Sequence, residues 1–543
     1  MKKLFLQAGA MALSVLLAGS LVACGGGTED DGRINTDENV TVTIFRYDLT
    51  SLSTAIRNET TISSYITDKF NLTVKTKTAP SSNWEESLNT LISTNRVPDM
   101  FVCYGPDRPV QYKKWVEQDI LLPISDYVSE EKHPNIYARL NDYNEFLNLD
   151  YAGGKHYAIP ILSGDNDHCL YIRTDWLKAV NEKTKFAGEP DFTEDGNRFH
   201  LTGPETMEEF YWVCKAFTEQ DPDGNGRDDT YGFSTNDDSL WFLNFAFYAY
   251  EEGGFHDRIW DEDTQKWTDT WIADGSKEAV KFFSRLYGER LMDTEFVNNT
   301  GDEKIDKFVT GKCGIMMHNA VSGYNRILEK FMEVNDGSRE MTYFAPPAGP
   351  TGLRGQRGGL GYYCFTAINS EVTANQRERL LSLLDYLMSE EGEKLMLYGV
   401  EGEHYEVDDE GNISTLLGKT ADGKQQNLAD VDAGTLFYTF VSSNENVIYP
   451  WSENSDTLQE IKEMTEANGK LTAPLQYYNG ENILSLGQAL DEYAESEYAN
   501  LIMGGMTDFD SKWSNFVNTY LTTYQGQKVM DEYNAAVKEY VRD

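Results

Sequence analysis

Basic residues are scarce in this 543-residue chain. It holds 47 lysines and arginines against 89 aspartates and glutamates, which gives a formal net charge of −42. An electrostatic field of this sign repels nucleic-acid phosphates and anionic lipid headgroups, and it favours solubility. The composition therefore excludes nucleic-acid binding and broad electrostatic contact with a membrane, and it leaves uncharged binding partners open.

Catalytic and metal-binding signatures are also lacking. The sequence has no HExxH motif, no GxSxG motif and no GxxxxGKS or GxxxxGKT motif, and its seven histidines are not clustered. The cysteines never occur as CxxC, so neither a zinc site nor a disulfide framework is indicated. The six cysteines are Cys24, Cys103, Cys169, Cys214, Cys313 and Cys364. A glycoside hydrolase needs only two opposed carboxylates, and that alternative stays open.

Beyond the N-terminus there is no apolar run of the length that spans a bilayer, about 20 residues. At the N-terminus, Lys2 and Lys3 precede a mostly apolar stretch that ends in LVAC at positions 21–24. This pattern predicts a signal peptide over residues 1–23. Cys24 is then a lipobox cysteine, acylated with palmitate, and the Gly-rich and acidic residues 24–39 form a flexible tether. A plain signal peptide or an uncleaved anchor helix is the alternative.

The pattern after the tether is that of an α/β protein. Residues 40–45 and 72–76 alternate as strands do, and amphipathic stretches separate them. Further strands are expected within 154–160, 170–176 and 311–317, and a long helix over 374–397. Chains longer than about 250–300 residues usually divide into domains. We therefore expect an α/β fold with more than one domain and largely parallel sheets.

The most specific local motif is the acidic stretch 221–229, DPDGNGRDD. Its side-chain oxygens fall at alternate places of an EF-hand-type calcium loop, and Gly226 falls where that loop turns sharply. The predicted ligands are Asp221, Asp223, Asn225, the carbonyl of Arg227, and Asp229. The last place, usually a glutamate, is Gly232. We expect a structural calcium ion here, and an acidic surface turn is the alternative.

Several motifs in order resemble one family. These are the lipobox, GKHYAIP at 154–160, YIRTDWL at 171–177, ETMEEF at 205–210, the acidic loop, and YGVEGEHY at 398–405. Together they resemble the family 1 extracellular solute-binding lipoproteins, relatives of the maltose-binding protein. The resemblance is strongest to a large Gram-positive subgroup that serves oligosaccharide importers.

The resemblance implies a two-lobe periplasmic-binding-protein-like fold with crossing hinge strands and the solute between the lobes. Residues 40–161 plus 362–397 would form the first lobe, and 170–357 plus 402–543 the second. The crossings would lie near 161–170, 358–362 and 398–401.

The resemblance also implies residues that face the ligand. Sugar sites combine aromatic faces with planar polar groups. The candidates are Asp48, Asp107, Arg108, Trp241, His318, Asn319, Tyr362 and Trp451. The alternatives are structural: a helix cap for Asp48, a solvated ion pair for Asp107 and Arg108, and core packing for the aromatic side chains.

The implied protein is the solute-binding component of an ABC importer, with no catalytic residues. It would capture a carbohydrate, an oligosaccharide above all, and deliver it to the permease subunits. It would be a monomer that touches the membrane through its lipid anchor only, on the extracellular side. A secreted carbohydrate-active enzyme and a binder of cationic or peptide solutes are the alternatives.

Overall fold

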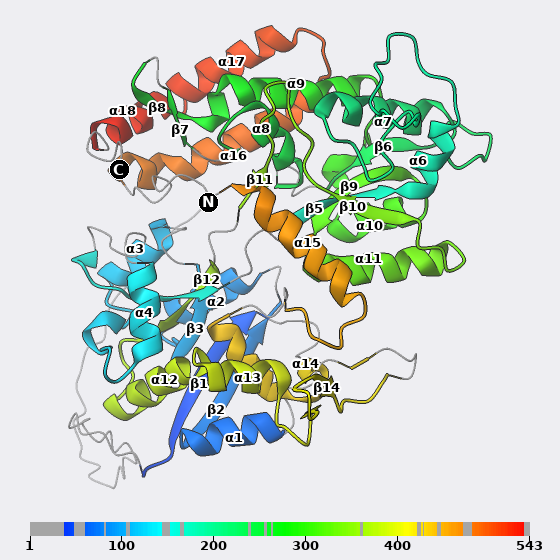
Figure 1. Ribbon diagram of the computed structural model, residues 1–543. Helices are drawn as coiled ribbons and strands as arrows, with labels where there is room; N and C mark the ends of the chain where they lie inside the picture. Colours follow the sequence, from blue (N-terminus) through cyan, green and yellow to red (C-terminus); the bar gives the residue numbers. More distant parts are fainter. Residues whose placement is uncertain are drawn as a thin grey trace, which may run out of the picture.

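The computed structural model describes residues 37–47, 60–80, 83–104, 109–143, 152–162, 168–236, 241–254, 258–261, 264–358, 362–420, 425–426, 428–442, 447–470 and 480–536. The predicted signal peptide, the lipobox Cys24 and the cleft candidates Asp48, Asp107 and Arg108 lie outside these residues. The described chain forms two α/β lobes, drawn one above the other in Figure 1.

The first lobe is built on a five-stranded sheet in the order β2–β1–β3–β12–β4. Its strands are β1 (Val40–Tyr47), β2 (Leu72–Ala79), β3 (Met100–Cys103), β4 (Ile159–Leu162) and β12 (Tyr362–Ile368). β1 is parallel to β2 and β3, whereas β12 is antiparallel to β3 and β4. The helices around it are α1 (Thr61–Lys69), α2 (Trp84–Ser93), α3 (Pro109–Glu117), η1 (Ile124–Asp126), α4 (Pro134–Asp142), α12 (Ala374–Leu387), α13 (Glu390–Tyr398), α14 (Leu428–Val431) and η6 (Ala433–Phe440). A small hairpin, β13 (Tyr405–Val407) with β14 (Ile413–Thr415), follows α13.

The second lobe is built on a four-stranded sheet in the order β10–β5–β9–β6. Its strands are β5 (His168–Arg173), β6 (Tyr231–Ser234), β9 (Cys313–Asn319) and β10 (Met341–Phe344). The helices in the first part of its chain are α6 (Thr174–Asn181), α7 (Met207–Glu219), η3 (Trp241–Leu243), α8 (Asn244–Tyr250), η4 (Thr270–Ile272), α9 (Asp274–Gly288), η5 (Phe296–Asn298), α10 (Gly301–Val309) and α11 (Val321–Val334). Near the C-terminus it adds α15 (Ser455–Asn468), α16 (Glu481–Met503), α17 (Phe509–Thr522) and α18 (Gly526–Ala536). Two-stranded pairs join β7 (Arg258–Asp261) to β8 (Lys266–Asp269), and β11 (Gln356–Arg357) to β15 (Gly469–Lys470).

The buried side chains form a separate hydrophobic core in each lobe. One cluster joins residues of the first sheet to α12 and to residues 428–441, and the largest cluster of the second lobe reaches from Leu170 to Val529. The expected assignment of 402–543 to the second lobe is therefore wrong for 428–441. Asp432 accepts a hydrogen bond from the backbone N–H of Ile62 (2.9 Å), and the carbonyl of Phe440 accepts one from Thr366 in β12 (2.7 Å). These bonds hold the segment on the first sheet.

Local sequence signals explain where the helices begin. The Thr206 hydroxyl accepts a hydrogen bond from the N–H of Glu209 (3.1 Å), which caps α7. The Glu209 carboxylate accepts from the N–H of Glu205 (2.9 Å), so the reciprocal bond of a capping box, from the N–H of Thr206, is not formed. The single helix expected over 374–397 is two helices, because Ser389 caps a new one by accepting from Gly392 N–H (3.1 Å).

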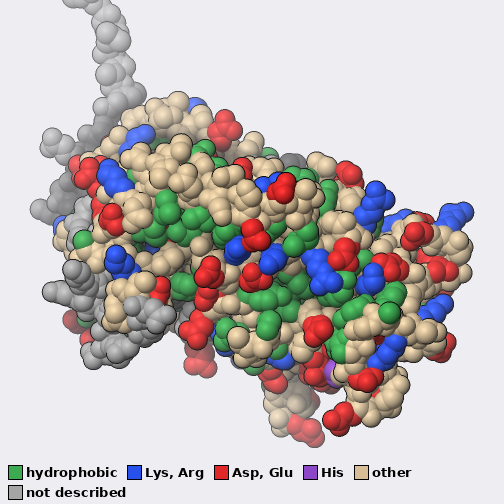
Figure 2. Space-filling model, turned by 90° about the horizontal axis from the view of Figure 1, so that it is seen from above, with side chains coloured by type: hydrophobic (Ala, Val, Ile, Leu, Met, Phe, Trp, Pro, Cys, Tyr) green, Lys and Arg blue, Asp and Glu red, His purple; other side chains and the backbone are tan. Residues whose placement is uncertain are grey.

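On the face seen in Figure 2, acidic, basic and hydrophobic side chains are interspersed, so this face carries no single charged patch. Among the residues described, none of the helices has the length and hydrophobicity that a bilayer crossing requires.

Candidate ligand-binding site

Three aromatic rings meet where the parallel strands of the first sheet end. Tyr47 ends β1, Tyr104 directly follows β3, and Trp84 begins α2. The ring centroids of Tyr47 and Trp84 are 5.5 Å apart, and those of Trp84 and Tyr104 are 5.1 Å apart. Open α/β sheets bind ligands outside the carboxyl ends of their strands. This aromatic cluster therefore marks the first-lobe edge of a candidate site.

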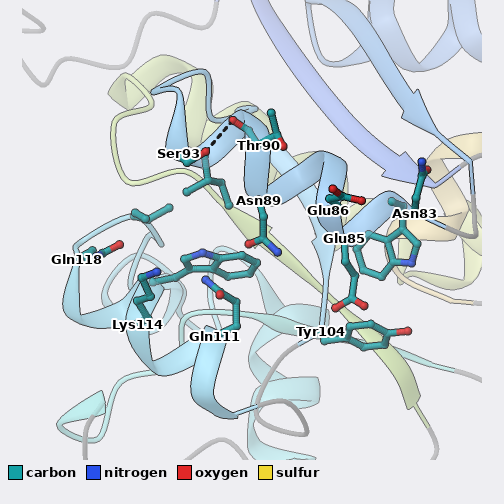
Figure 3. Close-up of a pocket in the computed structure, with 14 residues that line it drawn as sticks. Asn83, Glu85, Glu86, Asn89, Thr90, Ser93, Tyr104, Gln111, Lys114 and Gln118 are labelled. Atoms are coloured by element: carbon teal, nitrogen blue, oxygen red, sulfur yellow. Dashed lines mark hydrogen bonds between the residues drawn. The ribbon is translucent and has the colours of Figure 1, made fainter.

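A pocket of about 1050 Å³ opens beside this cluster, between α2 and α3. Asn83, Trp84, Glu85 and Tyr104 line its near end, and Figure 3 shows Glu85 directed toward Tyr104. α3 also contacts α16 of the second lobe, so the pocket borders the space between the lobes. Its near end combines aromatic rings with an amide and a carboxylate, the chemistry that recognises polar ligands with apolar faces.

Arg46 lies at the same strand end and is only 1% exposed. Its Nε donates to the carbonyl of Tyr47 (3.0 Å), and its guanidinium carbon lies 4.6 Å from the centroid of the Tyr47 ring. Neither Nη1 nor Nη2 has a hydrogen-bond partner in the part of the chain that the structure describes. Leaving buried charged donors unsatisfied costs free energy, so an acceptor oxygen from a ligand would stabilise this side chain.

The second lobe presents a polar edge where β9 ends. His168, at the start of β5, pairs with Asn319, at the end of β9, and His318 lies beside it. Burial and the nearby charge of Lys304 lower the pKa of His318 to about 3 and that of His168 to about 4. Both rings are therefore neutral at physiological pH. The N–H of Asn319 donates to Nδ1 of His318 (2.7 Å), which places the ring proton of His318 on Nε2 as a donor.

Phe242 packs against the two histidine rings of this edge, and Lys304 packs against Phe242. The Nζ atom of Lys304 is 2.8 Å from Oδ1 of Asn236 and 3.2 Å from the centroid of the Phe242 ring. The Phe242 ring in turn stands edge-on to the rings of His168 (5.2 Å) and His318 (6.0 Å). Lys304 is fully buried, so it holds these rings in place and does not itself form the surface.

The three aromatic candidates occupy different environments. Trp241 is 43% exposed, and the Arg357 guanidinium lies 4.5 Å from its ring centroid. Tyr362 is 6% exposed and packs against Phe365 at 5.0 Å, so it is a core residue of the first lobe. Trp451 stacks on Tyr449 at 5.3 Å, where the chain passes from the first lobe to the second.

Two of the candidates, His318 and Asn319, thus lie together. Trp241 is the chain neighbour of Phe242, whose ring packs against that of His318. Sequence reasoning did not select Arg46, Tyr47, Trp84 or Tyr104 as ligand residues. The available signal was their position, since three of them stand at or directly after strand ends and Trp84 opens the following helix.

The acidic loop connects α7 to β6 and is closed by hydrogen bonds between its own side chains and backbone. Oδ2 of Asp221 accepts from the N–H of Gly226 (3.1 Å), and Oδ1 of Asp223 accepts from the N–H of Asn225 (3.2 Å). The Asn225 amide also joins Asp223 Oδ2 (2.8 Å) to Asp229 Oδ1 (3.1 Å). The loop therefore gathers the carboxylates of Asp223 and Asp229 around the Asn225 amide, while Asp221 accepts from the loop backbone.

The side chains of this loop show whether it fits a cation. Oδ1 of Asp221 is buried with no hydrogen-bond partner in the described chain. Burial, together with the nearby charges of Asp221 and Asp229, raises the pKa of Asp223, as expected where carboxylates repel one another. Lys312 neutralises Asp229 in part, with Nζ 2.9 Å from Oδ2. The described residues hold no preformed cluster of three or more metal-ligating His, Cys, Asp or Glu. The donor set nonetheless fits a hard cation by type and order.

Two curated proteins of Bacillus subtilis are similar to this chain in sequence. The chain is 24% identical over 468 residues to the polygalacturonan/rhamnogalacturonan-binding protein YtcQ of Bacillus subtilis, covering 85% of this chain and 84% of YtcQ. It is 27% identical over 352 residues to lipoprotein LipO of the same organism, covering 62% of each.

Solved structures show the same fold. FusA, an ABC-transporter substrate-binding protein of Streptococcus pneumoniae in complex with kestose, superposes with a TM-score of 0.64 at 18% identity over 92% of this chain and 99% of FusA. An EF-hand mutant of FusA with fructo-nystose gives a TM-score of 0.61 at 19% identity over 91% and 100%.

The sequence pattern of bacterial extracellular solute-binding proteins matches residues 56–394, which is more than half of the chain. With its two-lobe α/β fold and polar, aromatic strand-end edges, the chain belongs to the bacterial extracellular solute-binding protein family.

Proposed function

We propose that this protein captures an oligosaccharide outside the cell and delivers it unchanged to the permease of an ABC importer. The observation that carries the proposal is that each lobe brings aromatic rings together with hydrogen-bonding side chains at or near the ends of sheet strands. The first lobe offers Tyr47, Trp84 and Tyr104, and the second offers Trp241 and His318. Aromatic faces cover the C–H surfaces of sugar rings, and neutral donors and acceptors bond their hydroxyls.

The relatives support a carbohydrate ligand. YtcQ is named for a polygalacturonan and rhamnogalacturonan, and FusA is solved with kestose. Arg46 adds unsatisfied donors that hydroxyl or carboxylate oxygens of a sugar would engage.

The test is a thermal-shift screen with fructo-oligosaccharides and oligogalacturonates, followed by calorimetry and chromatography of the recovered sugar. We expect a higher melting temperature, intact sugar, and a smaller radius of gyration in small-angle scattering as the lobes close. Cleaved sugar would identify an enzyme instead. Binding only to polyamines or cationic peptides, lost at high salt, would identify a cationic solute and overturn the carbohydrate assignment.

We also propose that the mature protein is a monomer held at the outer face of the cell membrane by lipid on Cys24. The LVAC sequence at 21–24 and the similarity to lipoprotein LipO support the anchor. Two acyl chains are needed for stable anchoring, because one gives only marginal membrane affinity.

Replacing Cys24 with alanine is expected to release the protein from membranes or to leave its signal peptide uncleaved, because the acylated thiol is lost. Membrane fractionation and the mass of the mature chain measure this, and Cys103→Ala, at a buried position, is the matched control. Normal maturation with unchanged membrane retention in Cys24→Ala would contradict the anchor.

We further propose that calcium binds in the acidic loop. Asp221, Asp223, Asn225 and Asp229 would supply side-chain oxygens, and Arg227 its carbonyl. The name of the FusA variant, an EF-hand mutant, indicates such a loop in a relative. A calcium ion would hold the connection between α7 and β6 rigid, so its role is structural.

A further inference from the structure

The pocket between α2 and α3 extends well beyond its near end, and we call it the α2–α3 groove. Its further lining comprises Asn89, Thr90, Ile92 and Ser93 from α2, and Gln111, Lys114, Trp115, Gln118 and Ile120 from α3 and the residues after it. α2 has ten residues, so the lined length is about 15 Å at about 1.5 Å per residue. The volume of about 1050 Å³ is as large as the largest small-molecule sites, about 300–1,000 Å³. The groove is therefore large enough for more than one sugar ring.

The groove walls suit hydroxyl groups. Figure 3 shows Asn89 of α2 and Gln111 of α3 pointing toward each other across the pocket. Each amide both donates and accepts hydrogen bonds, as a sugar hydroxyl does, whereas Lys114 only donates and an ionised Glu85 only accepts. With two glutamates and one lysine in the lining, the walls carry little net charge.

The floor of the groove is aromatic and rigid. Trp115 is 5% exposed, and its ring meets that of Phe101 edge-on, with centroids 6.3 Å apart and planes at 90°. Phe101 itself is fully buried in β3, so the floor is anchored to the sheet. A fixed aromatic surface beneath adaptable amides is a preorganised arrangement, which lowers the entropic cost of binding.

The groove is continuous with the candidate site. Trp84 and Tyr104 belong both to the strand-end aromatic cluster and to the groove lining. A chain that begins at this edge can therefore continue along α2 without leaving the protein surface.

We propose that one end of a bound oligosaccharide lies between the lobes and that its other end extends into the α2–α3 groove. This assignment rests on the proposed function and specifies its ligand class. Oligosaccharides of several sugar units should bind more tightly than short ones. Asn89 on α2 and Gln118 directly after α3 line the groove away from Trp84 and Tyr104, and both are exposed. We expect these two residues to contact long oligosaccharides but not short ones.

The test compares ligands of increasing length, from kestose upward among fructo-oligosaccharides and from the dimer to the octamer among oligogalacturonates. Calorimetry of the wild-type protein should show affinity that rises with length in the series that binds. Asn89→Ala combined with Gln118→Ala should weaken the longest ligand about three- to tenfold, the effect of lost hydrogen bonds, and change the shortest little. Gln459→Ala, an exposed glutamine on α15, is the matched control and should change neither.

Hydrogen exchange supplies an independent measurement. The long ligand, but not the short one, should slow exchange in peptides that cover 83–93 and 109–118. Equal affinity for long and short sugars, with no effect of the double substitution, would overturn the groove assignment and leave the proposed function intact. If the folded protein bound none of these sugars, the proposed function would fail, and the groove assignment with it.

Discussion

The melting temperature of the protein is expected to fall when EDTA is added and to recover with millimolar calcium. An ion that binds only the folded state adds RT ln(1 + [L]/Kd), about 2.7 kcal/mol at a hundredfold excess over Kd. The acidic loop provides the physical reason, because the Oδ1 atom of Asp221 is buried without a partner in the described chain. Burial and repulsion within the loop raise the pKa of Asp223, and a bound cation would neutralise the repelling carboxylates. Calorimetric melting with and without the chelator measures the effect.

Asp223→Ala should abolish the difference between the two melting curves. The matched control is Asp408→Ala, in a second acidic turn where Oδ1 of Asp408 accepts from the N–H groups of Glu410 (2.9 Å) and Asn412 (2.8 Å). That turn also has oxygen-bearing side chains at alternate places, but Ile413 stands where the 221–229 loop has Gly226, so the sharp turn of a calcium loop is missing. Its loss should therefore leave the calcium dependence unchanged. A wild-type protein that melts identically in EDTA and in calcium would show that the 221–229 loop is only a turn.

The α/β class was predictable because hydrophobic periodicity records which residues are buried. The expectation of largely parallel sheets was wrong, because β12 in the first sheet and β5 in the second run antiparallel to their neighbours. The same signal does not record against which neighbour a residue is buried. Residues 428–441 illustrate the limit: their apolar pattern fits either lobe, and their placement depends on Asp432 meeting the N-terminus of α1. That contact joins positions far apart in the sequence, so the expected second-lobe range of 402–543 included them incorrectly.

The candidate site was predictable in part. His318 and Asn319 were selected through the family resemblance, and the structure places them side by side at the end of β9. Tyr362 was selected for its aromatic ring at an expected crossing, yet its ring packs against Phe365 in the first core. Arg46 was missed because its position at a strand end does not reveal that its guanidinium is buried, and only the structure shows its two unsatisfied nitrogens.

Trp241→Ala is expected to weaken oligosaccharide binding by about 2 kcal/mol, some thirtyfold in Kd, the cost of losing an aromatic anchor. The ring is 43% exposed, which is unusual for a tryptophan with only a structural role, and it lies next to Phe242 at the second-lobe edge. The Arg357 guanidinium 4.5 Å from the ring centroid holds the indole in orientation through a cation–π contact. Stacking on a sugar would therefore require little reordering of the side chain.

The measurement is calorimetry with the sugar that the thermal-shift screen identifies, at low and high salt. Tyr137→Ala is the control, because Tyr137 is equally exposed, at 40%, but lies on α4 in the first lobe. An uncharged sugar should bind with the same affinity at both salt concentrations, since its contact with Trp241 involves no ligand charge to screen. If Trp241→Ala and Tyr137→Ala bound equally well, the indole would not touch the ligand, and the second-lobe contacts would reduce to the polar edge formed by His318 and Asn319.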